Sequence, residues 1–273
     1  MGYGEALFLG LLQGITEFLP VSSSGHLVLG ESLIGLEVEA LKSFDVVVHL
    51  GTFAAIIIYF WKDIVGLFKG FFSYMGLAKK TSDNKEYRHL IGYIVIGTIP
   101  AVVVGLFLEE AIDFLFRSTL YVGLWMIIVA EIFILAEWTS KKFKKEKRLD
   151  WKKSVLIGVA QAAALIPGVS RSGSTIAAGL FQGISREKAA RFSFLLALPA
   201  IFGAGLLTGI KEFRAGGGLD VAFVPLIIGF VASAVAGFVA VYFLMKFLKK
   251  HSLNIFTYYL FAIGTVSILV SFL

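Results

Sequence analysis

The chain has 273 residues, of which 58% are hydrophobic, and soluble domains contain roughly 45–50% apolar residues, so an ordinary soluble protein is excluded. The net charge of +6 does not indicate a nucleic-acid partner, because the basic residues are confined to short loops between apolar segments. The chain contains no cysteine, which excludes disulfides, thiolate nucleophiles and cysteine-ligated metals, so any catalysis must use oxygen or imidazole groups. An all-α polytopic membrane protein is predicted.

The first predicted elements are two short apolar segments, 4–19 and 25–34, separated by a break that contains proline and serine. At about 1.5 Å per residue, neither helix would cross a hydrocarbon core of about 30 Å. We expect a re-entrant hairpin whose tip is enclosed by protein, because non-helical backbone at membrane depth must be covered. Residues 1–10 lack the basic segment of a signal peptide, so we expect them to remain in the mature chain.

Three long apolar segments follow this pair, and the same order of one broken pair and three long segments then recurs. Membrane spans are expected at 44–61, 90–108 and 120–138, and again at 192–210, 221–247 and 255–273. The second broken pair is 154–166 with 174–181. We therefore expect one membrane domain, 1–273, built from repeats of about 1–138 and 153–273 and joined by a basic cytoplasmic linker at 139–152.

The two broken pairs carry the same polar pattern at a constant separation in the sequence. A shift of 148 residues matches Gly10 with Gly158, Gln13 with Gln161, Ser22 with Ser170, Ser24 with Ser172, and Gly25 with Gly173. Because three spans separate the pairs, the second pair must enter the membrane from the opposite side. The predicted fold is two inverted repeats, each a re-entrant helical hairpin plus three transmembrane helices.

The distribution of basic residues gives an orientation. Four loops that this topology places on one side, 62–89, 139–153, 184–191 and 246–253, carry 20 of the 25 Lys and Arg residues. By the positive-inside rule this side is cytoplasmic, so both termini are expected on the outer face.

Ionisable residues at the two breaks are the candidates for chemistry. Glu17 and His26 belong to the first break and Arg171 to the second. A charge at the bilayer centre costs about 2.5–3.5 kcal/mol on insertion scales, so such residues indicate function. A structural ion pair of Glu17 with Arg171 is the alternative, but it does not explain the many hydroxyl groups beside them. These are Ser22, Ser23, Ser24, Ser170, Ser172, Ser174 and Thr175.

One arginine, several hydroxyls and two helix N-termini near Gly25 and Gly173 together suit a phosphate group. For any single serine, capping of the broken helix is an equally good explanation. Glu17 and His26 would act as acid and base, or Glu17 would hold a divalent cation against the phosphates, and the residues alone leave both open. Gln13 lies one helical turn before Glu17, and we expect it to orient Glu17 rather than bind metal.

Both breaks resemble the motifs of the BacA-type undecaprenyl-diphosphate phosphatases, the bacitracin-resistance proteins. The first motif is present as Gln13, Glu17, the run FLPVSS at 18–23, Gly25 and His26. The second is present as Pro167, Gly168, Ser170, Arg171, Ser172 and Thr175, followed by SFLLALP from Ser193. The resemblance covers essentially the full length.

This resemblance implies hydrolysis of undecaprenyl diphosphate to the monophosphate and inorganic phosphate, which recycles the lipid carrier of cell-wall synthesis and confers bacitracin resistance. It also implies interdigitated inverted repeats, a bacterial plasma membrane, a site open to the outer face, and a divalent cation, Mg²⁺ or Ca²⁺. The expected partners are the polyprenyl diphosphate substrate and membrane lipids, and the sequence leaves open whether the protein forms a homodimer.

By motif position, the resemblance makes Glu17 and His26 catalytic and Ser23 a candidate nucleophile, alongside His26 itself and metal-bound water. It assigns diphosphate binding to Ser170, Arg171 and Thr175, and we add Ser22 and Ser172 as neighbouring hydroxyls. Gln13 stands where many members of the family have Glu, which favours Glu17 as the main metal ligand.

Two other families share part of these features. The type-2 phosphatidic-acid phosphatases also have SGH and SR elements, but they need a second histidine after the arginine, and the stretch that follows Arg171 has none. A lipid flippase or ion-coupled transporter is the alternative function, because secondary transporters commonly combine inverted repeats with broken helices.

Overall fold

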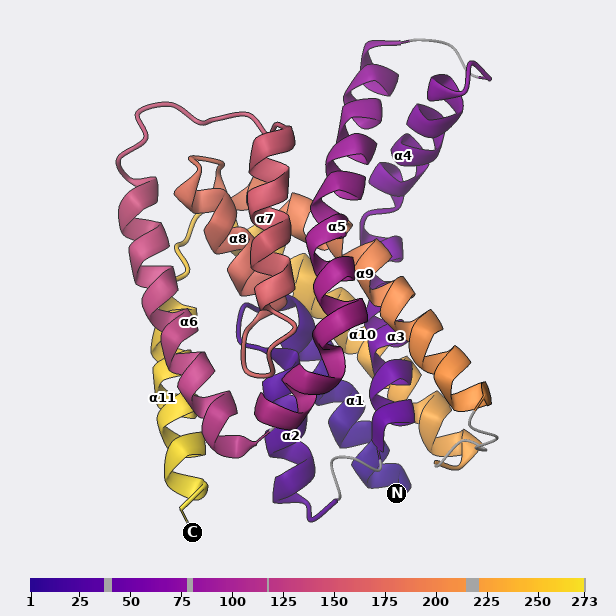
Figure 1. Cartoon of the computed structure of the whole chain (residues 1–273), viewed down its shortest axis with the longest axis vertical. Helices are drawn as coiled ribbons and strands as arrows, with labels where there is room; N and C mark the ends of the chain where they lie inside the picture. The colour runs from indigo at the N-terminus through magenta and orange to yellow at the C-terminus, as the bar shows by residue number, and fades with distance from the viewer. Residues whose placement is uncertain (37–40, 78–80, 117, 215–220, 273) are drawn as a thin grey trace.

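The computed structural model describes residues 1–36, 41–77, 81–116, 118–214 and 221–272, and within these ranges all regular structure is helical. The helices are α1 (Tyr3–Phe18), α2 (Ser23–Leu33), α3 (Lys42–Tyr59), α4 (Trp61–Tyr74), α5 (Ser82–Phe116), α6 (Thr119–Ser140), α7 (Trp151–Ala163), α8 (Arg171–Phe181), α9 (Arg186–Arg214), α10 (Phe223–Leu248) and α11 (Asn254–Val270). Figure 1 shows them as one elongated bundle.

All six expected spans are helical. By length and composition, α5, α6, α9 and α10 each contain a segment that is long and apolar enough to cross a membrane. The helix α3 forms a pair with α4 that is bent by 79° at a short break, and α11 is a shorter apolar helix. The chain is thus a multi-pass, all-α membrane protein.

The loop expected at 62–89 is the main error, because most of it is helical. The helix α4 packs along the first turns of α5, and a Cβ at Gly66 would lie 2.2 Å from the ring of Tyr87. Asp63 of α4 also accepts a hydrogen bond from Arg191 Nε of α9, at 3.1 Å. Charged residues interrupt the apolar pattern of α4, so a search for uninterrupted apolar runs does not find it.

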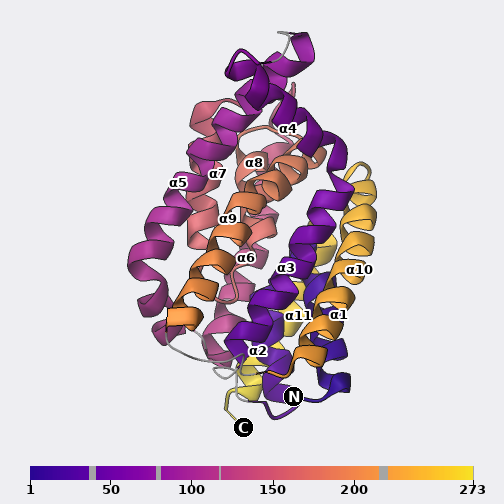
Figure 2. The ribbon, with the colours of Figure 1, turned by 90° about the vertical axis from the view of Figure 1, so that its right-hand side faces the viewer.

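The two broken pairs form hairpins that extend from opposite ends of the bundle. In Figures 1 and 2, α1 and α2 occupy the half that contains both termini, and α7 and α8 occupy the other half. The longest of the four helices, α1, has 16 residues and reaches about 24 Å at about 1.5 Å per residue, which is short of a full crossing. Their tips meet inside the bundle, where Ser172 Oγ lies 3.3 Å from the carbonyl oxygen of Leu19.

Each hairpin packs against a long helix from the other half of the chain. The helix α1 lies along α10, where a Cβ at Gly10 would be 2.7 Å from the carbonyl oxygen of Gly229. The helix α7 lies along α5, where a Cβ at Gly158 would be 2.2 Å from the carbonyl oxygen of Gly97. Gly10 and Gly158 are a pair that the shift of 148 residues matches, and each makes a close contact with backbone of a helix from the other half of the chain.

The contact of α1 with α10 gives a stability prediction. We expect Gly10→Ala to destabilise the protein by about 1–3 kcal/mol, because the added methyl group overpacks a contact between backbones. Gly4→Ala in the same helix is the matched control, since a Cβ there meets nothing within 4 Å. Thermal unfolding of the two variants in detergent measures the difference, and equal unfolding temperatures would contradict the tight contact.

Candidate functional site

Two serines cap the helices that begin at the hairpin tips. Ser22 Oγ accepts a hydrogen bond from the backbone nitrogen of Gly25 at 3.3 Å, and Ser170 Oγ accepts one from Gly173 at 3.1 Å. The four residues are two matched pairs of the repeat. Ser22 and Ser170 are therefore N-caps, and each leaves the positive end of a helix dipole at the tip.

Glycine follows each cap because α6 lies directly behind both tips. A Cβ at Gly25 would lie 2.6 Å from the side chain of Met126, and one at Gly173 would lie 2.5 Å from the ring of Phe133. Both of these neighbours are fully buried. The helix α6 therefore supports the first turns of α2 and α8 and fixes their separation.

The backbone at Ser22 is in an unusual conformation. Its φ of +72° is the one positive value at a non-glycine residue in the described part of the chain. Such a conformation costs on the order of 1–3 kcal/mol and persists only where surrounding contacts impose it. At Ser22 it turns the chain between the end of α1 and the start of α2, which brings Ser23 beside Glu17.

Glu17 is the centre of the polar network and is buried near the end of α1. Its Oε1 atom forms an ion pair with Arg171 Nη2 of the other tip. Its Oε2 atom accepts hydrogen bonds from Ser23 Oγ at 2.6 Å and Gln13 Nε2 at 2.9 Å. The structure brings these four predicted residues together, and Gln13 has the orienting contact expected from the sequence.

His49 is a fifth member of this network, which the sequence did not assign. Its Nε2 atom lies 3.7 Å from Glu17 Oε2, and its Nδ1 atom lies 2.6 Å from the carbonyl oxygen of Asp45. A carbonyl oxygen only accepts hydrogen bonds, so Nδ1 carries a hydrogen. The position of this histidine in the apolar α3 was its only signal in the sequence.

His26 lies on α2 and is held on both ring nitrogens. Its Nδ1 atom lies 2.7 Å from the carbonyl oxygen of Ser22 and therefore donates to it. Its Nε2 atom lies 2.7 Å from the hydroxyl of Tyr259, and the two rings stack with 10° between their planes. Tyr259 is on α11, 233 residues away, and nothing in the sequence linked it to the site. In the neutral ring, Nε2 is the acceptor, and in this structure its lone pair accepts the hydroxyl hydrogen of Tyr259.

Hydroxyls of the second tip bond mainly to the protein itself. Thr175 Oγ1 donates to the carbonyl oxygen of Arg171 at 2.8 Å and accepts from Ser193 Oγ at 2.5 Å. Ser172 Oγ reaches the carbonyl oxygen of Leu19 at 3.3 Å and lies 3.3 Å from Ser170 Oγ. These groups fix the first turn of α8, which carries Arg171, and join it to the end of α1.

Two buried polar atoms of the network lack a hydrogen-bond partner. They are Nη1 of Arg171 and Oε1 of Gln13, which lie on either side of the Glu17 carboxylate in the network. An unpaired buried donor or acceptor costs about 1–3 kcal/mol, and each such atom in a native structure calls for an explanation. One free cationic donor and one free amide oxygen are suited to an anion and to a cation respectively.

The residues give limited support for a metal site. Among the described residues, no group of three or more His, Asp or Glu side chains lies close enough to hold a metal ion. At the tips the oxygen donors are Glu17 and the free Oε1 of Gln13. Mg²⁺ is commonly held by one or two carboxylates together with substrate phosphates, so this set fits a cation that binds together with a phosphorylated substrate.

The sequence matches a known protein family and many relatives along its length. The family model described as bacitracin resistance protein BacA matches residues 6–266. A protein of Methanosphaera stadtmanae named undecaprenyl-diphosphatase is 42% identical and covers 98% of this chain and 97% of its own. Proteins with the same name from Desulforudis audaxviator and Geotalea daltonii are 41% and 43% identical, with coverage of 96–98% of each chain.

The buried ion pair gives a prediction that needs no substrate. We expect Glu17→Gln or Arg171→Gln to destabilise the protein by about 3 kcal/mol each, because each change leaves the other charge buried and unpaired. The double variant should lose much less than the sum. Glu187→Gln is the control, because its pair with Lys249 is exposed and should contribute less than about 1 kcal/mol. Thermal unfolding of the four variants gives the coupling, and additive losses would show that the two charges do not stabilise one another.

Proposed function

Because this chain belongs to the bacitracin resistance protein BacA family, we infer that it is an integral membrane undecaprenyl-diphosphatase. The reaction converts undecaprenyl diphosphate to undecaprenyl phosphate and inorganic phosphate. This hydrolysis returns the lipid carrier to cell-wall synthesis and confers bacitracin resistance.

One observation carries the assignment of the site: the contact of Glu17 with both Arg171 and Ser23 at the junction of the two hairpin tips. This contact places a carboxylate, a hydroxyl and a guanidinium together, with helix N-termini on both sides. Hydrolysis of a phosphoanhydride needs a nucleophile, a base and a group that stabilises negative charge.

Arg171 is the proposed anchor of the diphosphate. Its free Nη1 atom can donate to a phosphate oxygen while Thr175 and Ser193 hold the backbone of its helical turn. The first turns of α2 and α8 supply further N–H groups, beneath the caps Ser22 and Ser170. A bound diphosphate competes with Glu17 for Arg171, and the displaced carboxylate becomes a stronger base.

Ser23 is the proposed nucleophile, because its hydroxyl already donates to the Glu17 carboxylate at 2.6 Å. As Ser23 Oγ bonds to the terminal phosphorus, its proton passes to Glu17 and the bond from that phosphorus to the bridging oxygen breaks. Undecaprenyl phosphate leaves with the bridging oxygen. Water then attacks the phosphorus of the phosphoserine, and His26 Nε2, once the Tyr259 hydroxyl has moved away from it, takes a proton of this water. The bond from phosphorus to Ser23 Oγ breaks, Glu17 returns its proton to Ser23 Oγ, and inorganic phosphate is released.

A divalent cation, Mg²⁺ or Ca²⁺, is part of this proposal. When bound, it offsets the repulsion between the substrate phosphates and the Glu17 carboxylate. Glu17 Oε1, which Arg171 releases when it binds the diphosphate, and the free Oε1 of Gln13 would hold it, and the phosphates would supply other ligands.

The proposed location is the bacterial plasma membrane, with both termini and the opening of the site at the outer face. The basic segment at 141–150 lies at the end of the bundle opposite the two termini (Figure 1). By the positive-inside rule, the basic end is cytoplasmic. The inverted repeats of about 1–138 and 153–273 are also part of the proposal, supported by the matched caps and the interleaved glycine contacts.

Transport is the alternative, because two broken helices that meet tip to tip also occur in secondary transporters. Release of phosphate from a polyprenyl diphosphate by the purified protein in detergent, with a divalent cation and no gradient, supports the enzyme. No release, together with flux of the lipid or an ion in vesicles, would favour transport.

Substitutions at the tips test the roles in that assay. We expect Ser23→Ala and Glu17→Gln to lower the rate of phosphate release by about a hundredfold or more, because each removes a partner in proton transfer. Glu5→Gln is the matched control, since Glu5 is in the same helix and bonds only to the N-terminal turn, so its rate should stay near that of the native protein. A Ser23→Ala variant with near-native turnover would exclude Ser23 as the nucleophile and leave His26 or activated water.

A further inference from the structure

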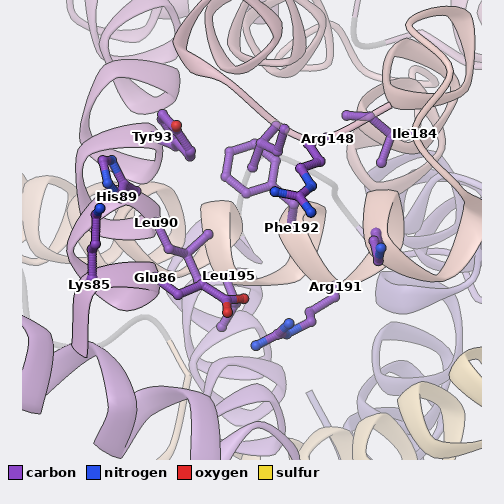
Figure 3. Close-up of a pocket in the computed structure, with 12 residues that line it drawn as sticks. Lys85, Glu86, His89, Leu90, Tyr93, Arg148, Ile184, Arg191, Phe192 and Leu195 are labelled. Atoms are coloured by element: carbon purple, nitrogen blue, oxygen red, sulfur yellow. The ribbon is translucent and has the colours of Figure 1, made fainter. Parts of the chain in front are cut away.

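A cavity of about 560 Å³ lies away from the hairpin tips, between α5, α9 and the segment that precedes α7. Figure 3 shows Lys85, His89 and Tyr93 along α5 on one side, Arg148 reaching in from the linker, and Arg191 on another side. Its size is within the range of about 300–1,000 Å³ that is typical of small-molecule sites. None of the roles proposed for the hairpin tips uses these residues.

The cavity has more positive charge than its surroundings neutralise. Four Lys and Arg side chains line it, against the single carboxylate of Glu86. Two of the four are paired: Lys188 with Glu146 at 2.9 Å, and Arg191 with Asp63. The other two are Arg148 and Lys85, and neither forms an ion pair with any residue that the structure describes.

Arg148 is held over the cavity by contacts on both sides of it in the sequence. The backbone nitrogen of Lys147 donates to the carbonyl oxygen of Gly183 at 2.8 Å, which ties the linker to the loop between α8 and α9. Asp150 Oδ1 accepts from the backbone nitrogen of Lys153 at 3.0 Å and caps α7. These two contacts fix the backbone on either side of Arg148 and place this residue at the wall of the cavity, where its exposed side chain is open to a ligand.

Polarity changes with depth along both helices that line the cavity. On α5 the charged Lys85 and Glu86 come first, and Leu90 and Tyr93 lie further along the helix. On α9 Arg191 is followed by Phe192 and Leu195. Both helices begin here and continue as candidate membrane spans, so the charged residues lie at the membrane surface and the apolar ones toward its interior.

We propose that this cavity binds the phosphate group of an anionic membrane phospholipid, with Arg148 and Lys85 on the phosphate and an acyl chain along Leu90, Phe192 and Leu195. Charged residues at the membrane surface and apolar residues further in match the headgroup and acyl chain of an amphiphile. A soluble anion would bind the charged residues but would have no group to contact the apolar ones. Basic pockets between helices at the cytoplasmic surface are suited to anionic headgroups. The site is at the basic end of the molecule and is distinct from the catalytic tips.

Lipid binding to the purified full-length protein in detergent tests this proposal. Native mass spectrometry would be used to titrate phosphatidylglycerol, with phosphatidylcholine as the zwitterionic comparison. We expect tighter binding of phosphatidylglycerol, and about tenfold weaker binding of it in Arg148→Gln, because a hydrogen bond between charged groups is lost. Lys85→Gln should also weaken the binding of phosphatidylglycerol. Because Lys85 is exposed on α5, this variant should fold, and it replaces Arg148→Gln in the test if that variant does not fold.

Lys144→Gln is the matched control, because it removes one charge from the same linker at a residue that does not line the cavity. Its affinity for phosphatidylglycerol should stay within about twofold of the native value, since diffuse surface charge contributes little to a specific contact. An equal loss in Lys144→Gln would show general attraction to a basic surface and overturn the site. Inorganic phosphate that displaces the lipid and shows the same dependence on Arg148 would identify a soluble-anion site instead, and equal binding of the two lipids would also overturn the proposal.

Discussion

The ion pair between Glu17 and Arg171 is the interaction on which the rest of the structure depends. The two residues are 154 positions apart and belong to hairpins that extend from opposite ends of the bundle. Either charge alone would be costly to bury at this depth. Their attraction is largely offset by the cost of burying both charges, so the pair contributes little net stability. Its main effect is to select one arrangement of the helices, because only the packing in which the two tips meet pairs both charges. The same contact places a carboxylate and a guanidinium at the site proposed for the phosphorylated substrate.

Broken helices are the means by which polar groups reach that depth. A continuous helix satisfies its own backbone, whereas a break leaves donors and acceptors that need partners. Ser22 and Ser170 supply the caps, and α6 packs behind both first turns with no space for a side chain at Gly25 or Gly173. The strain at Ser22 is confined to the tip that carries Ser23 and His26, while its counterpart Ser170 has an ordinary φ of −69°. The two tips thus share their caps but differ in the backbone conformation at the cap and in the ionisable residues beside it.

The hairpin tips inside the bundle and the cavity at the basic end present different surroundings to anions. At the tips, one arginine is matched by one carboxylate, so a phosphate must compete for it. At the basic end, Arg148 and Lys85 form no ion pair with any residue that the structure describes, and apolar residues extend the cavity toward the membrane interior. At the tips, a phosphate can bind Arg171 only if it displaces Glu17 from the ion pair. In the cavity at the basic end, an anion can bind Arg148 and Lys85 without breaking an ion pair of either residue. The first arrangement suits turnover, and the second suits a resident lipid.

The sequence by itself determined the membrane class, the six long helices, the two broken pairs and the residues at their tips. These features depend on local properties, namely apolar run length, prolines and glycines at the breaks, and charges where lipid would otherwise be expected. Only the tertiary structure decided that Glu17 contacts His49, that Tyr259 holds His26, and that Thr175 and Ser193 support Arg171. It also revealed α4, whose interrupted apolar face is stabilised by packing against α5. These contacts join residues far apart in the chain, and no local pattern encodes which distant side chain will fill a given position.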